Sequence, residues 1–258
     1  KTADLVALTS ALIRIPTINP PGDAYIPCAE LIGNRLAKRG FQVEYIRAHD
    51  TPGDSDKFPR TNIIARIEGK GPGPVVHFNS HIDVVEVGHG WTVDPFGGEV
   101  RDGILYGRGA TDMKSGVAAF AAAAIDLVQE APPDGAIILA ITGDEEANAI
   151  DGTTALLDHM EQAGEAMSVC LVGEPTCPEK MGEMIKIGRR GSMSAWITVS
   201  GVQGHSAYPH RAKNPLPAMA RLMDRLASHT FDDGTAHFDP STLAVVTIDT
   251  GNPATNVI

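Results

Sequence analysis

The chain has 258 residues, of which 43% are hydrophobic and 21% are charged, so it is long enough to bury a core. Its formal net charge of −11 argues against a nucleic-acid partner, because phosphate binding needs a basic surface. No stretch approaches the roughly 18 uninterrupted apolar residues of a membrane span, and the N-terminus shows no secretory signal. Three cysteines make no disulfide framework. We therefore expect an acidic cytoplasmic protein without a membrane partner.

Helix and strand patterns alternate along the first three quarters of the chain. Apolar residues recur at helical spacing in four segments, 2–14, 25–39, 113–129 and 153–162. Short alternating or fully apolar runs predict strands at 41–46, 62–67, 75–79, 136–142 and 169–172. This alternation predicts an α/β domain with a mostly parallel sheet that helices cover on both faces.

The pattern changes near residue 188. We expect a half-exposed strand at 193–200, a helix at 215–228 and a further strand at 243–248. This order predicts the start of a second, smaller α+β domain, which buries little on its own and therefore looks truncated. The expected domains are a catalytic, metal-binding domain at 1–187 and the N-terminal part of a second domain at 188–258.

His81 and Asp83 directly follow the apolar strand predicted at 75–79. In open α/β sheets, ligands gather at the carboxyl ends of the strands. The His-x-Asp pair suits a metal site, because one residue can bind the ion while the other holds the imidazole in the correct tautomer. Taken alone, the pair also fits a histidine that is satisfied beside a turn.

Four further carboxylates follow predicted strands or begin predicted helices: Asp112, Glu145, Glu146 and Glu174. Each has an ordinary alternative, namely a helix N-cap for Asp112, an acidic cluster before a helix for the adjacent pair, and a solvated turn for Glu174. One imidazole with several carboxylates at a single sheet edge is costly unless a cation is present. The set suits zinc or a similar divalent metal, and a shared carboxylate suits two ions.

Several motifs together resemble one family. HIDVV, GRGATDMKSG, TGDEE and GEPT, in this order and spacing, resemble the M20 di-zinc aminoacylases and peptidases, as do IKIGRRGSMSAWITVSGVQGHSAYPH at 185–210 and ATNVI at 254–258. The fit is closest to the branch that hydrolyses N-succinyl-L,L-2,6-diaminopimelate to succinate and diaminopimelate in lysine and cell-wall precursor synthesis. The resemblance covers nearly the whole chain. It implies a zinc-peptidase-like catalytic domain followed by a dimerisation or lid domain.

The resemblance also implies the ligands of two zinc ions per complete subunit, with Co²⁺ as a possible substitute. His81 and Glu174 would bind one ion, Glu146 would bind the other, and Asp112 would bridge both. The second metal site would be incomplete in this chain. The family completes that site with a histidine far beyond the second domain, and no such motif surrounds the remaining histidines 77, 89, 159, 210, 229 and 237.

Two residues would assist the metal ligands. The resemblance implies that Asp83 orients His81 and that Glu145 is the general base, which takes a proton from the attacking water and passes it to the leaving amine. Adjacent Glu145 and Glu146 point in opposite directions on an extended backbone, which fits one base and one ligand.

The second domain would add substrate contacts. In the family, the histidine of the GHSAYPH stretch crosses a dimer interface, which implies a homodimer and makes His205 a donor to the tetrahedral oxyanion. An exposed loop histidine is the alternative. Arg189, Arg190, Tyr208 and Asn256 would hold the carboxylates of a small anionic N-acyl amino acid, for which arginine offers a bidentate fork. The adjacent arginines also fit a solvated patch.

Three features depart from the family pattern. Ile82 replaces the usual threonine, Glu86 replaces a proline, and the final histidine ligand is missing. We therefore expect the N-terminal portion of a longer enzyme, which by itself is weakly active or inactive.

Two alternative functions remain open. The first is another deacylase with the same chemistry, such as an acetylornithine deacetylase, or a dipeptidase; the arginine-rich turn favours a succinyl substrate instead, since that substrate carries an extra carboxylate. The second is a non-catalytic metal-binding or dimerisation module. Glu145 argues against the second, because a binding module has no need of a free base.

Overall fold

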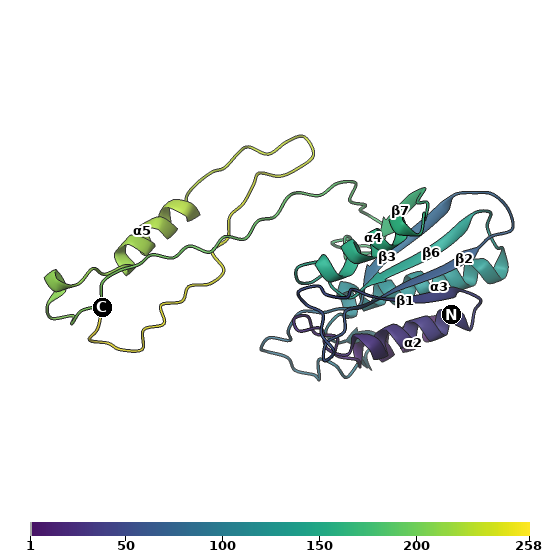
Figure 1. The fold of residues 1–258 in the computed structure, drawn as a ribbon, viewed down its shortest axis with the longest axis horizontal. Helices are drawn as coiled ribbons and strands as arrows, with labels where there is room; N and C mark the ends of the chain where they lie inside the picture. The colour runs from purple at the N-terminus through teal and green to yellow at the C-terminus, as the bar shows by residue number, and fades with distance from the viewer. Residues whose placement is uncertain (1) are drawn as a thin grey trace. The chain divides into compact units, whose positions relative to one another are not determined.

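A computed structural model describes residues 2–258 (Figure 1). The chain divides into two compact units, the first ending at Met184 and the second running over Ile185–Ile258. The boundary expected from the sequence, between residues 187 and 188, lies close to this division. In the part of the chain that the structure describes, no helix is long and apolar enough to cross a bilayer.

A five-stranded sheet in the order β1-β2-β6-β3-β7 forms the centre of the first unit (Figure 1). Its strands are β1 (Gln42–Arg47), β2 (Thr61–Glu68), β3 (Val75–His81), β6 (Ala136–Thr142) and β7 (Val169–Val172). β3 pairs in parallel with both β6 and β7, whereas β1 pairs with β2 and β2 with β6 in the antiparallel sense. The predicted α/β fold is confirmed. The parallel half of the sheet is the half whose carboxyl ends lead into the candidate site.

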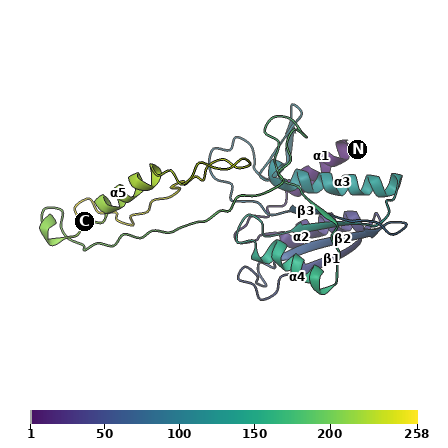
Figure 2. The same cartoon turned by 90° about the horizontal axis from the view of Figure 1, so that it is seen from above.

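Helices cover both faces of this sheet. They are α1 (Thr2–Ile13), α2 (Tyr25–Ala37), α3 (Ser115–Glu130) and α4 (Ala155–Gln162), and the structure confirms all four predicted helical segments. Every residue of β6 is buried, and its side chains alternate between two apolar clusters. Leu139 and its neighbours on one face pack with α1, α2 and α3, whereas Ile138 and Ala140 pack with α4. Figure 2 shows α3 and α4 on opposite sides of the sheet.

The small side chains of α3 allow it to lie close to the sheet. Ala118, Ala121 and Ala124 are buried together with Val117 and Ile125. Because this face fixes the position of the helix, it also fixes the loop at its N-terminus, which carries Asp112 toward the end of β3.

A two-stranded hairpin of β4 (Glu99–Arg101) and β5 (Ile104–Tyr106) was not predicted. Its turn residues Asp102 and Gly103 both have positive φ, 52° and 78°. An Asp-Gly pair is the usual sequence of such a two-residue turn. The signal was therefore present in the sequence, although the flanking strands are too short to show a periodic pattern.

The second unit contains α5 (Leu216–Ala227), which confirms the helix expected there. The two strands expected at 193–200 and 243–248 are wrong. Among residues 185–258, all of which the structure describes, the only strand pairings are two isolated bridges. A strand needs a partner edge and an apolar face to cover it, and neither forms here, so Trp196 and Val246 remain 89% and 85% exposed.

Leu139→Ala tests whether the central strand carries the stability of the first unit. Leu139 is fully buried in β6, so we expect the substitution to reduce the free energy of unfolding by about 2–5 kcal/mol. Leu127→Ala in α3 is the matched control, because Leu127 is 46% exposed and its removal should cost about 0.5 kcal/mol or less. Urea denaturation followed by circular dichroism measures both values. Equal losses would contradict the assignment of β6 to the core.

Candidate metal centre

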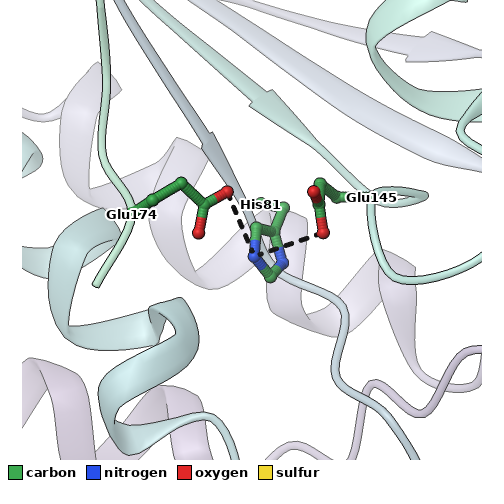
Figure 3. A group of neighbouring side chains, drawn as sticks. All are labelled: His81, Glu145 and Glu174. Carbon is green, nitrogen blue, oxygen red and sulfur yellow. Dashed lines mark ion pairs between the residues drawn. The ribbon is translucent and has the colours of Figure 1, made fainter. Parts of the chain in front are cut away.

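Five side chains that can bind a metal lie together where β3, β6 and β7 end: His81, Asp112, Glu145, Glu146 and Glu174. His81 is the last residue of β3, the glutamate pair follows β6, and Glu174 follows β7. Figure 3 shows His81, Glu145 and Glu174 converging from these three segments. The structure thus brings together the set that the sequence singled out.

The imidazole of His81 is the centre of the group. Its Nε2 lies 3.1 Å from Oδ1 of Asp112, and 3.9 Å from both Oε2 of Glu145 and Oε1 of Glu174. Two overlapping groups have all their ligand atoms within 4.8 Å of one another, His81 with Glu145 and Glu174, and His81 with Asp112 and Glu146. His81 belongs to both groups, but its Nε2 has one lone pair and can bind one cation, so a second cation would have to be held by the carboxylates.

Asp83 holds this arrangement from behind. The residue is fully buried, and its carboxylate accepts hydrogen bonds from the backbone amides of Glu145 and Glu146, both at 3.0 Å. Nδ1 of His81 lies 3.0 Å from the backbone carbonyl oxygen of Asp83 and 3.3 Å from its carboxylate. In the neutral ring these contacts keep the proton on Nδ1, which leaves the lone pair of Nε2 for a cation.

The backbone at Glu145 and Glu146 is not extended, so the premise for expecting their side chains to point in opposite directions does not hold. The backbone after β6 bends around Asp83, and both amides donate to the same carboxylate. Because the backbone is bent and not extended, both glutamate carboxylates come within reach of His81, one in each group of candidate ligands. The geometry therefore allows Glu145 to act either as a base or as a ligand.

When no cation is bound, His81 and Glu146 hold their protons more strongly than usual, because of the charges around them. Burial lowers the pKa of His81, but its hydrogen bond to Asp83 and the charges of Asp83, Glu174 and Glu145 outweigh this and raise the pKa to about 9. Burial and the neighbouring charge of Asp112 raise the pKa of Glu146 to about 7. A divalent cation would displace such protons and neutralise the carboxylates, so the donor set fits a metal.

Asp112 lies in the tight turn Ala110–Lys114, which leads into α3. Gly109 has a φ of +78°, and a Cβ there would lie 2.5 Å from Val84, so this turn requires glycine. Lys114 is fully buried and donates from Nζ to the carbonyl oxygens of Leu12 and Ile15, at 2.9 and 2.7 Å. No side chain caps α3, which rules out the N-cap alternative for Asp112.

Part of the candidate substrate set gathers in the second unit. The rings of His205 and Tyr208 have centroids 6.0 Å apart, and the backbone carbonyl of Asn256 accepts a hydrogen bond from the amide of Ser206. His205 is exposed, which agrees with the alternative of an exposed loop histidine. The five residues of the metal centre belong to the first unit.

Arg189 and Arg190 lie in an exposed stretch of the second unit that has no helix or strand. Their exposure matches the alternative of a solvated patch as well as the expected substrate contact. The substrate role of both arginines therefore stays a prediction.

The sequence analysis missed Asn19. Its side-chain amide donates to Asp83 at 2.9 Å and to Asp144 at 2.8 Å, and all three residues are buried. These partners are 64 and 125 positions away along the chain, so no local pattern marks Asn19. Asp144 lies within the TGDEE motif, so the sequence held a signal for one of these three residues.

Solved structures share this fold. An M20 family metallo-carboxypeptidase from Sulfolobus solfataricus aligns with a TM-score of 0.63 at 18% identity, over 87% of this chain and 50% of that one. A tripeptidase from Staphylococcus aureus aligns with a TM-score of 0.64 at 17% identity, over 100% of this chain and 63% of that one. At these identities the likeness supports the fold alone.

Sequence comparison goes further. The profile of peptidase family M20/M25/M40 matches residues 77–253. Proteins named succinyl-diaminopimelate desuccinylase from Ruegeria pomeroyi and Cereibacter sphaeroides are each 62% identical, over 100% and 99% of this chain. The chain spans 65% and 64% of the length of these two relatives. With the profile match and the clustered metal ligands in agreement, the chain belongs to peptidase family M20/M25/M40.

Proposed function

We propose that this chain is the metal-binding part of a zinc-dependent amidohydrolase that converts N-succinyl-L,L-2,6-diaminopimelate to succinate and L,L-diaminopimelate. The observation that carries the proposal is the cluster of His81 with four carboxylates, in a chain 62% identical to proteins named for that reaction. We propose that the protein acts in the cytoplasm, where this biosynthetic reaction would take place.

Two zinc ions would occupy the centre, with Co²⁺ as a substitute. His81 and Glu174 would hold one ion, Glu146 the other, and Asp112 both. The support for this role of Asp112 is that its Oδ1 lies 3.1 Å from Nε2 of His81 and that it also groups with Glu146. Bound zinc polarises an amide carbonyl and lowers the pKa of water. Asp83 would keep the His81 ring oriented throughout.

Glu145 would serve as the general base. Its side chain is 37% exposed, so it can reach a water molecule and the leaving amine while its backbone amide stays fixed to Asp83. It would accept the proton of the attacking water and donate that proton to the departing nitrogen. A ligand role for Glu145 is the competing assignment within the same site, because its carboxylate also lies near His81 and Glu174.

The second unit would bind the acyl amino acid. Arg189, Arg190, Tyr208 and Asn256 would pair with the carboxylates of the small anionic substrate, and the exposure of both arginines leaves them accessible. In a homodimer formed through this unit, His205 of the partner subunit would donate a hydrogen bond to the oxyanion. The net charge of −11 makes such local cations necessary for capturing an anion.

Glu145→Gln separates the two assignments of Glu145. If Glu145 is the base, the full-length protein should lose about 10²- to 10⁴-fold in kcat and keep its zinc content, because the amide side chain cannot accept a proton. Steady-state kinetics and metal analysis of the purified protein measure both effects. Glu68→Gln is the control, since Glu68 is exposed and pairs with the opposite end of β6. Loss of zinc together with activity would instead make Glu145 a ligand.

Substrate choice tests the proposed reaction. The full-length protein with added zinc should hydrolyse N-succinyl-L,L-diaminopimelate with a higher kcat/KM than N-acetylornithine, since the succinyl group offers an additional carboxylate to the arginines. Preference for the acetyl substrate would keep the metal centre and move the protein to a deacetylase function. Bound zinc without turnover of either substrate would support a non-catalytic metal-binding module.

Metal removal should affect stability as well as activity. A chelator should abolish hydrolysis by the full-length protein and lower its Tm, because a ligand that binds only the folded state stabilises it. Zinc or cobalt should restore both, and magnesium should not, since an imidazole with carboxylates suits the former metals. A Tm that does not respond to the chelator would contradict a metal site in the first unit.

A further inference from the structure

A buried polar network lies behind the metal centre, and of its members only Asp83 has a role in the proposed reaction. Its members are all at most 5% exposed: Asn19, Arg60, Asp83, Asp144 and Asp151. Three of the five are carboxylates and one is a cation. Buried charges are tolerated only when they are paired and hydrogen-bonded, so the contacts within this network decide whether the region is stable.

Asn19 joins the two carboxylates nearest the site. Its Nδ2 donates to Oδ2 of Asp83 at 2.9 Å and to Oδ1 of Asp144 at 2.8 Å. Two buried carboxylates that share one hydrogen-bond donor lie close enough to repel each other. The primary amide of Asn19 reduces this repulsion because it offers one N–H to each carboxylate. On its other side, Oδ1 of Asn19 accepts a hydrogen bond from Nη1 of Arg60 at 2.9 Å, which fixes the direction in which the amide points.

Arg60 supplies the positive charge of the network. Besides Asn19, it donates to the hydroxyl of Tyr25 at 3.0 Å and to the carbonyl oxygen of Gly53 at 2.9 Å, and its Nε lies 3.3 Å from Oδ2 of Asp151. Asp151 in turn donates from its backbone amide to Asp144 at 3.0 Å. The guanidinium therefore holds Asn19 in place and offsets part of the negative charge around it.

Two members of the network, Asp83 and Asp144, connect it to the metal centre. Asp83 accepts the backbone amides of Glu145 and Glu146 and contacts His81. Asp144 directly precedes that glutamate pair in the chain. Because Asn19 ties Asp83 to Asp144, it holds both the carboxylate that the glutamate amides bind and the residue from which their turn begins.

We propose that Asn19 is a positioning residue for the metal centre: by bridging Asp83 and Asp144, it fixes the His81 ring and the turn that carries Glu145 and Glu146. This proposal rests on the proposed metal-dependent function for its effect on activity. The bridge itself is a property of the folded first unit and can be tested without a metal.

Asn19→Ala in the full-length protein is the test. Removing the amide leaves Asp83 and Asp144 without their common donor, so we expect Co²⁺ to bind about 10- to 100-fold more weakly and with an altered visible spectrum. In the metal-free protein, hydrogen exchange at the amides of Glu145 and Glu146 should become faster. A loss of kcat larger than any change in KM should accompany these effects.

Ser10→Ala is the matched control. Ser10 is also buried and loses a hydrogen bond, to the carbonyl oxygen of Gly98, but it does not contact the network. This variant should lower the Tm while the cobalt spectrum and the exchange of Glu145 and Glu146 stay as in the wild type. Where Asn19→Ala does not fold, Asn19→Leu has a similar shape, removes the donors without adding a charge and is tested with the same readouts.

The outcomes separate this proposal from the proposed function. Wild-type cobalt affinity and spectrum in the Asn19 variant overturn the positioning role, whatever its Tm. If the wild-type protein itself binds no cobalt, the proposed function fails, and hydrogen exchange alone decides the positioning role. Unchanged exchange at Glu145 and Glu146 then overturns it, and faster exchange in the variant but not in Ser10→Ala supports it.

Discussion

The carboxylate of Asp83 is fully buried and collects hydrogen bonds from separate parts of the chain, namely Asn19, His81 and the amides of Glu145 and Glu146. The N–H groups lower its pKa against the opposing effect of burial, so it remains charged inside the protein. A buried charge is expensive, and its cost is offset only while every one of these donors stays in place. The metal centre therefore depends on three segments, those that carry Asn19, His81 and the Glu145–Glu146 pair, packing together around the carboxylate of Asp83.

The sheet explains why these segments meet. The parallel alignment of β6, β3 and β7 brings their carboxyl ends to one edge, and His81 comes directly from the end of β3. The antiparallel strands β1 and β2 extend the other half of the sheet and carry Arg60 beside Asn19 at their junction. The two halves thus have different tasks, since one presents the candidate ligands and the other supports the network behind them.

The cluster of charges distinguishes a metal centre from a structural ion-pair group. The pKa of His81 is raised to about 9 and that of Glu146 to about 7. Without a cation, these two side chains therefore keep their protons to a higher pH than an ordinary histidine or glutamate would. Structural ion pairs alternate opposite charges, whereas one imidazole here faces four carboxylates. This imbalance is the physical reason for expecting divalent cations, and the family membership of the chain agrees with it.

The sequence by itself determined the α/β class, the four helices and five sheet strands of the first unit, and the five candidate ligands, because hydrophobic period and strand-end position are local properties. Tertiary structure decided what depends on distant partners. Asn19 contacts residues 64 and 125 positions away, and Glu145 and Glu146 both come within reach of His81 because their backbone bends around Asp83. The strands expected in the second unit also failed for this reason, since an alternating segment becomes a strand only when a neighbouring edge pairs with it.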